Sequence, residues 1–89
     1  MNIKKNKLPK WFDGVVYEIG DEVRNPFSGE TCVLTAQELS MYDFIMGAQF
    51  FIDVIGHDSN KAQNIIKEMT AGLDWFRSTN PKAYMVLLD

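Results

Sequence analysis

The sequence predicts a single α+β domain, with a three-stranded antiparallel meander, a long central helix, an amphipathic helix and a short C-terminal helix. Apolar side chains alternate with a period of two in the first third of the chain, and later recur at spacings of three and four. The chain has 89 residues, 46% of them hydrophobic and 24% charged, so it is too apolar for disorder and too short for two cores. We expect a basic arm at residues 1–10 and one domain at residues 11–89.

The meander is predicted from residues 14–34. In "GVVYEIGDEV", Val15, Tyr17 and Ile19 point one way while Val16 and Glu18 point the other, which is the period of a half-buried strand. Gly20 and Asp21, two residue types that are common in turns, follow this segment.

Two more strands flank "NPFSG", residues 25–29. Asn25 and Pro26 open this turn, and Gly29 can take the left-handed conformation that closes it. A three-stranded sheet of this length is marginal unless a helix covers one face, so we expect the next segment to pack on it.

The central helix is predicted to start at Thr35, because Thr35 and Glu38 have the spacing of a capping box. Its polar residues fall in one narrow stripe, and the second half, "FIMGAQFFIDVI", is apolar almost all round. Gly56 is placed to end the helix with a positive φ angle.

A helix that is apolar almost all round is expected to be covered by other protein surfaces. One possibility is that the sheet and the later helices of the same chain enclose it. The other, which we favour, is that a second copy covers the part that one small domain cannot reach, so that the protein is a homodimer. The predicted interface residues are Gly47, Phe50, Val54 and Trp75, the last lying off the core stripe of its own helix.

The second helix is predicted to begin at Asp58 or Ser59 and to bury an ordinary amphipathic stripe. Asn80 and Pro81 end it. Residues 81–88 are then either a short third helix or a closing strand, and the proline at a first helical position favours the helix.

Charge is distributed unevenly along the chain. Four lysines, Lys4, Lys5, Lys7 and Lys10, lie in the first ten residues, which leaves five basic against twelve acidic side chains in the rest. The predicted acidic surface comprises Glu18, Asp21, Glu22 and Glu30. Such a field favours basic protein partners. Nucleic-acid binding would have to use the lysine arm and is the less favoured alternative.

Catalytic and metal-binding motifs are weak. Cys32 and His57 each occur once and could pair as nucleophile and base in a minor enzyme, the third possible function, but a thiol within a strand is usually a small buried hydrophobe. Asp53, His57 and Asp58 resemble metal ligands, yet a polar helix end accounts for them more simply. We therefore expect no cofactor and no catalytic residue.

The localisation expected from the sequence is cytoplasmic. One cysteine cannot form an intramolecular disulfide, and no secretory signal precedes the domain. Acidic side chains spread along residues 35–56 argue against a membrane span there.

Two stretches, "NPFSGE…LTAQELSMYDFIMG" and "GLDWFRSTNPKAYMVLLD", resemble small uncharacterised proteins encoded by tailed bacteriophages, particularly those of marine bacteria. The resemblance covers residues from about 8 to 89. It implies a viral protein that acts in the host cytoplasm and binds other proteins, and it implies no particular functional residue. From the sequence we therefore expect a small non-enzymatic interaction module, homodimeric, with an acidic surface for a basic protein partner.

Overall fold

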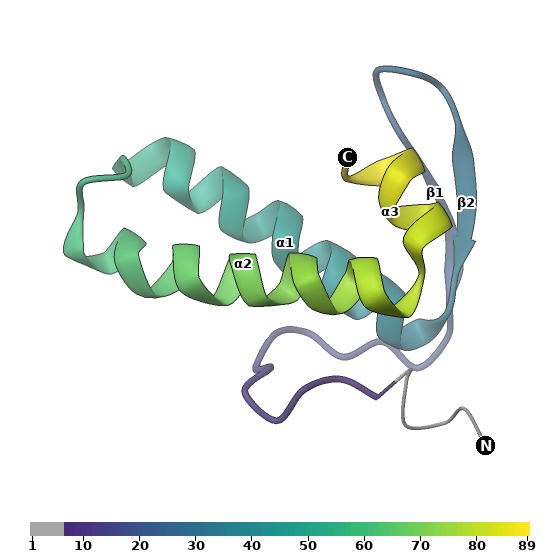
Figure 1. Cartoon of the computed structure of the whole chain (residues 1–89), viewed down its shortest axis with the longest axis horizontal. Coiled ribbons are helices and arrows are strands. Elements are labelled where there is room, and N and C mark those ends of the chain that lie inside the picture. Colours follow the sequence, from purple (N-terminus) through teal and green to yellow (C-terminus); the bar gives the residue numbers. More distant parts are fainter. Residues whose placement is uncertain (1–6) are drawn as a thin grey trace.

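The computed structural model describes residues 7–89 and shows an α+β fold with two strands and three helices (Figure 1). The elements are β1 (Asp21–Arg24), β2 (Thr31–Leu34), α1 (Ala36–Ile55), α2 (Asn60–Thr79) and α3 (Pro81–Leu87). α1 and α2 run side by side in opposite directions, and the β-hairpin and α3 lie together at the end of this pair remote from the α1–α2 connection.

The two strands pair antiparallel, with Val23 opposite Cys32 and Asp21 opposite Leu34. The turn between them forms as its sequence predicts, because Asn25 accepts a hydrogen bond from the backbone of Gly29, which has a φ of 80°. The Nδ2 of Asn25 also donates to the carbonyl oxygen of Val86 at 2.8 Å, so the turn is tied to α3.

The expected first strand of the meander does not form. Residues 14–20 are irregular, and Val15 and Val16 are both 63% exposed, so the alternating side chains do not divide between a buried and an open face. The backbone N–H of Tyr17 donates to Ser40 Oγ of α1 at 2.9 Å. Gly20 lies against the junction of β2 and α1, which directs the preceding chain towards α1 and away from the open edge of β1.

Helix α1 begins where its capping box predicts. Thr35 Oγ1 accepts from the backbone N–H of Glu38 at 3.2 Å, and the Glu38 carboxylate accepts from the backbone N–H of Thr35 at 3.0 Å. The same carboxylate accepts from Asn80 Nδ2 at 3.2 Å, so the start of α1 is bound to the α2–α3 junction. Gly56 follows the helix with a φ of 87°, as expected for a helix-ending glycine.

The ends of α2 and α3 are also fixed by local polar contacts. Of the two candidate caps for α2, Ser59 is the one used: its Oγ accepts from the backbone N–H of Lys61. Asn80 Oδ1 accepts from the backbone N–H of Ala83, and Pro81 occupies the first position of α3. Residues 81–87 are therefore helical, which settles the choice between helix and strand.

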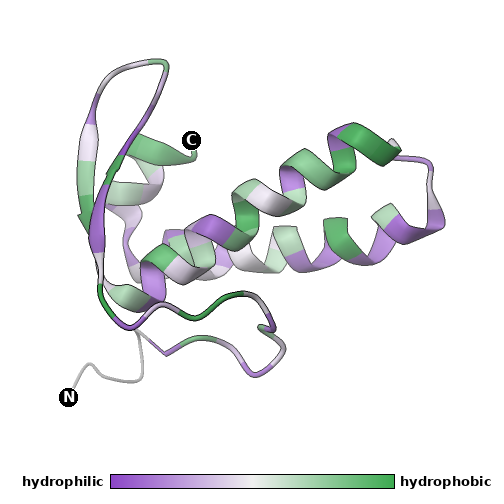
Figure 2. Ribbon diagram, turned by 180° about the vertical axis from the view of Figure 1, so that it is seen from behind, coloured by the Kyte–Doolittle hydropathy of each residue, from purple (hydrophilic) through white to green (hydrophobic). Residues whose placement is uncertain are grey.

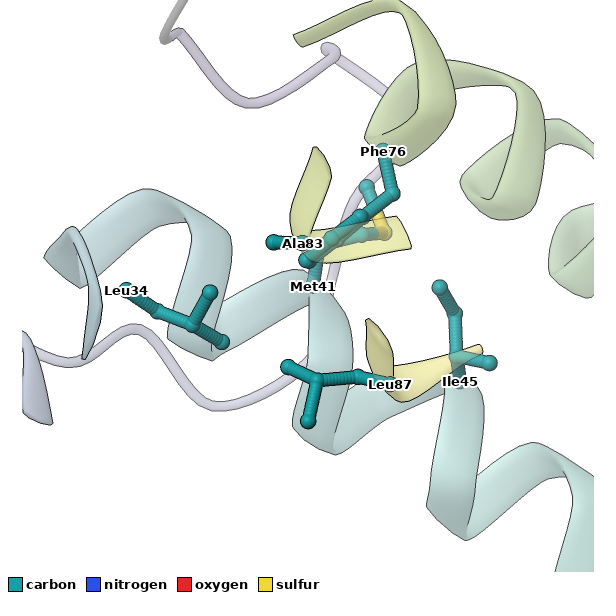
Figure 3. Close-up of a cluster of buried hydrophobic side chains, with 6 residues drawn as sticks. All are labelled: Leu34, Met41, Ile45, Phe76, Ala83 and Leu87. Carbon is teal, nitrogen blue, oxygen red and sulfur yellow. The ribbon is translucent and has the colours of Figure 1, made fainter. Parts of the chain in front are cut away.

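A small core joins all the elements near the hairpin end (Figure 3). Its buried side chains are Leu34, Met41, Ile45, Phe76, Ala83 and Leu87. Gly72 lets α1 and α2 approach closely, because a Cβ at Gly72 would lie 2.9 Å from Met41 Sδ. The core therefore secures the first half of α1 more fully than the second.

The N-terminal segment, residues 7–20, packs across the two long helices. Trp11 and Phe12 lie with their ring centroids 5.8 and 5.6 Å from that of Phe44 in α1. Trp75 of α2 donates from Nε1 to the carbonyl oxygen of Lys7 at 2.9 Å. Lys7 of the predicted arm therefore contacts α2, whereas Lys4 and Lys5 of that arm lie outside the described residues.

Candidate functional site

One side of α1 is covered by the N-terminal segment along its first half and is exposed along its second half. Ser40, Asp43 and Phe44 lie on the covered half, where the N-terminal segment supplies contacts to all three residues. Because residues three and four positions apart share a side of a helix, the same side continues towards residue 54. None of the contacts described above between residues 7–20 and α1 lies beyond Phe44 on this side of the helix.

The bare half is apolar and exposed, and we refer to it as the α1 face. It consists of Met46 (44% exposed), Gly47, Phe50 (71%), Phe51 (38%) and Val54 (66%). Figure 2 shows that hydrophobic residues dominate α1 towards the α1–α2 connection, whereas hydrophilic residues are frequent along α2. The opposite side of α1 carries the buried residues Ala48 and Ile52.

Gly47 makes a gap in this face. A Cβ built at Gly47 would meet no atom within 4 Å among the described residues. The bulky Phe50 stands one turn further along the same side. The face therefore combines a projecting ring with an adjacent open patch of backbone.

The sequence predicted three of these positions and missed two. Gly47, Phe50 and Val54 all lie on the α1 face, while Met46 and Phe51 were not singled out. Their helical angles, beside those of Phe50 and Gly47, could have identified them. Trp75 lies elsewhere, half-buried on α2 against the N-terminal segment, where it has a hydrogen-bond partner within the chain.

The predicted acidic residues are all exposed, but they are spread along the hairpin end. Glu18 precedes the sheet, Asp21 and Glu22 lie in β1, and Glu30 precedes β2. Arg24 lies in β1 two residues after Glu22, so one positive charge interrupts the row. The four carboxylates are therefore exposed at the hairpin end but do not form a compact cluster.

Tyr17 and Asp43 join the N-terminal segment to α1. The Asp43 carboxylate raises the pKa of the Tyr17 phenol above 10.0 through its negative charge, and desolvation and a hydrogen bond to Asp43 act in the same direction. The phenol stays neutral at physiological pH and can donate to the carboxylate. The hydrogen bond from the Tyr17 backbone to Ser40 Oγ joins the same part of the segment to α1.

Cys32 and His57 are not brought together. Cys32 lies in β2, directly before α1, and the exposed His57 follows the last residue of α1. A 20-residue helix, about 30 Å long, therefore separates them. Asp53 accepts a hydrogen bond from Gln49, and within residues 7–89 no three side chains of metal-binding type gather closely enough to hold an ion.

Comparison with known proteins does not place the chain in a family. No family model, curated protein or solved structure matches it. None of the helices within residues 7–89 combines the length and hydropathy needed to cross a membrane. The candidate site is therefore defined by its own geometry, and the resemblance to phage proteins stays a prediction.

Proposed function

We propose that the protein is a small non-enzymatic interaction module that forms a homodimer through the α1 face and presents an acidic surface to a basic protein partner. We place its action in the cytoplasm, that of the host if a phage encodes it. The exposed apolar α1 face is the observation that carries the proposal, and a second copy of the chain is the occupant that fits it.

The size of the α1 face supports an interface. Its four large side chains expose on the order of 400 Å², as much as the largest apolar patch of a typical monomer, which often marks a contact site. A standard interface buries roughly 800 Å² on each partner. Val15 and Val16 are also exposed apolar residues, on the segment that Tyr17 joins to the first half of α1.

The shape of the α1 face supports a copy of itself as the partner. In a two-fold symmetric contact, each residue of one copy that touches a residue of the other is matched by the reverse contact. Phe50 of one copy can lie over the open backbone of Gly47 in the other, and the reverse contact forms at the same time. A projecting ring beside a gap on one surface satisfies this requirement.

The acidic surface supports a basic partner. From residue 11 to residue 58 the chain has nine carboxylates, all exposed except Glu38, and Arg24 is the only lysine or arginine there. Clefts and surfaces of one charge attract partners of the other and raise their association rates. The hairpin lies at the opposite end of α1 from Val54, so both contacts can form at once (Figure 1).

Sedimentation velocity of the wild type and of Phe50→Glu tests the dimer. We expect the wild type to sediment as a dimer at micromolar concentration and Phe50→Glu as a monomer, because symmetry brings two buried charges into one interface. Met85→Glu is the matched control. Met85 is 68% exposed on α3, so the same charge is introduced at similar exposure but away from the α1 face.

We expect Met85→Glu to keep the dimer and both variants to keep wild-type circular dichroism. A wild type that stays monomeric at high concentration would overturn the dimer proposal. Equal dissociation by both glutamates would show that the effect comes from net charge and not from the α1 face.

A further inference from the structure

A hollow of about 520 Å³ lies between the N-terminal segment and the C-terminal half of α2. Its walls include Pro9 and Trp11 on one side and Ala71, Asp74, Trp75 and Ser78 on the other. Its volume falls within the range of small-ligand sites, about 300–1,000 Å³. A second hollow, about 440 Å³, shares Trp11 and Ala71 with it and extends along α2 past Lys67 and Glu68.

Both tryptophans of the chain line the first hollow. The Trp75 indole is fixed by its hydrogen bond to Lys7, and Trp11 is fixed by packing against Phe44. Two indoles held by the fold at the rim of a hollow are suited to cations, because the faces of aromatic rings attract positive charge and indole does so most strongly.

Asp74 gives the hollow its charge. Among the described residues that line it, Asp74 carries the only formal charge, and its side chain is 65% exposed. Lys7 and Lys10 belong to the same N-terminal segment, but neither lines the hollow. The carboxylate already accepts from a guanidinium, since Arg77 Nη2 lies 3.0 Å from Asp74 Oδ1.

We propose that this hollow binds a cationic side chain, with a guanidinium as the best fit, from a basic segment of a protein partner. This inference rests on the proposed function, since it names how the basic partner is recognised. The indoles of Trp11 and Trp75 contact the cation, and Asp74 pairs with it. An arginine suits such a site, because its planar group stacks on aromatic faces and also binds carboxylates.

Tryptophan fluorescence reports on this site directly. The probe is the blocked tripeptide acetyl-Gly-Arg-Gly-amide, and its control contains citrulline, which has nearly the same shape but no charge. We expect the arginine peptide to change the emission saturably and citrulline to bind at least about tenfold more weakly. Trp11→Phe and Trp75→Phe, with folding checked by circular dichroism, assign the signal to each indole.

Three charge variants make the test specific. Asp74→Asn should weaken arginine binding about tenfold, whereas Glu68→Gln, which changes only the second hollow, should leave it unchanged. Arg77→Gln removes the cation that competes within the chain and should bind the peptide as tightly as the wild type or more tightly. The side chains of Asp74 and Arg77 are exposed and that of Glu68 is half-buried, so circular dichroism checks that each variant keeps the fold.

Equal binding of the arginine and citrulline peptides would overturn the proposal, as would undiminished binding to Asp74→Asn. A peptide that binds without any change in emission also excludes this site and points to the acidic hairpin. The dimer proposal can fail independently of this one. Dimerisation is measured by sedimentation, and the hollow lies away from the α1 face.

Discussion

Gly20 is the residue that decides the path of the N-terminal segment. A Cβ at this position would overlap the carbonyl oxygen of Leu34 and would lie 2.9 Å from its carbonyl carbon and 3.0 Å from that of Thr35. These are backbone atoms at the junction of β2 and α1, which cannot rotate away as a side chain can. Only glycine lets the chain pass this close.

We therefore expect Gly20→Ala to destabilise the fold by at least about 1–3 kcal/mol, the usual cost of forcing extra atoms into a packed site. Urea unfolding followed by circular dichroism measures the change. Gly14→Ala is the comparison variant and should cost less, because the atoms nearest to a Cβ there belong to the side chain of Phe12 and not to the backbone. Equal midpoints for Gly20→Ala and the wild type would show that the segment does not lie against this junction.

Local polar signals predicted individual residues well. Thr35, Gly29 and Asn80 perform the roles that the sequence assigns them, because caps and turns depend on residues within a few positions of each other. The pairing of Tyr17 with Ser40 spans 23 positions, and no local pattern shows it. The same limit explains why the hollow between Trp11 and Trp75 could not be foreseen.

At the scale of elements, the first strand of the predicted meander failed for a related reason. Alternation in residues 15–19 indicates two faces, but a strand also needs its backbone to lie along the edge of another strand. Here the N–H of Tyr17 is taken by Ser40, and Gly20 turns the segment towards α1. Helices were easier to predict, since their hydrogen bonds are internal and their caps are local.

Gly47 tests the α1 helix and the dimer together. Glycine inside a helix is less stable than alanine by about 0.5–1 kcal/mol, and a methyl at Gly47 meets nothing in the single chain. Gly47→Ala should therefore stabilise the monomer by about this amount, as measured by urea unfolding in the monomeric Phe50→Glu background. In the wild-type background it should weaken association, because the methyl occupies the space that Phe50 of the other copy fills.

The second half of this prediction is the more discriminating. A variant that gains stability while its dimerisation constant stays unchanged would place Gly47 outside the interface. A loss of stability in the monomeric background would instead show that α1 has a different backbone near this residue. Sedimentation equilibrium and urea unfolding separate the two outcomes.

At the scale of the whole molecule, the fold divides α1 between internal and external contacts. Its first half packs against the sheet, α2, α3 and the N-terminal segment, and among the elements formed by residues 7–89 its second half has only α2 beside it (Figure 1). The sequence predicted an apolar surplus on this helix, since one small domain cannot surround 20 residues. It could not predict that residues 7–20 cover the first half, because that depends on contacts such as the hydrogen bond from Tyr17 to Ser40, 23 positions apart.

The two proposed contacts of the molecule should respond to salt in opposite directions. α1 contains Glu38, Asp43 and Asp53 but no basic residue, so two copies of α1 bring like charges together. Salt screens that repulsion and strengthens apolar association, and we expect the dimer to tighten between about 50 mM and 500 mM sodium chloride. Binding of a basic peptide through Asp74 and the acidic hairpin should weaken over the same range, because salt also screens attraction.

Sedimentation equilibrium measures the first trend and tryptophan fluorescence the second. Were the dimer to weaken with salt as the peptide does, opposite charges would have to meet in its interface, and the apolar α1 face would not be the surface that joins the two copies.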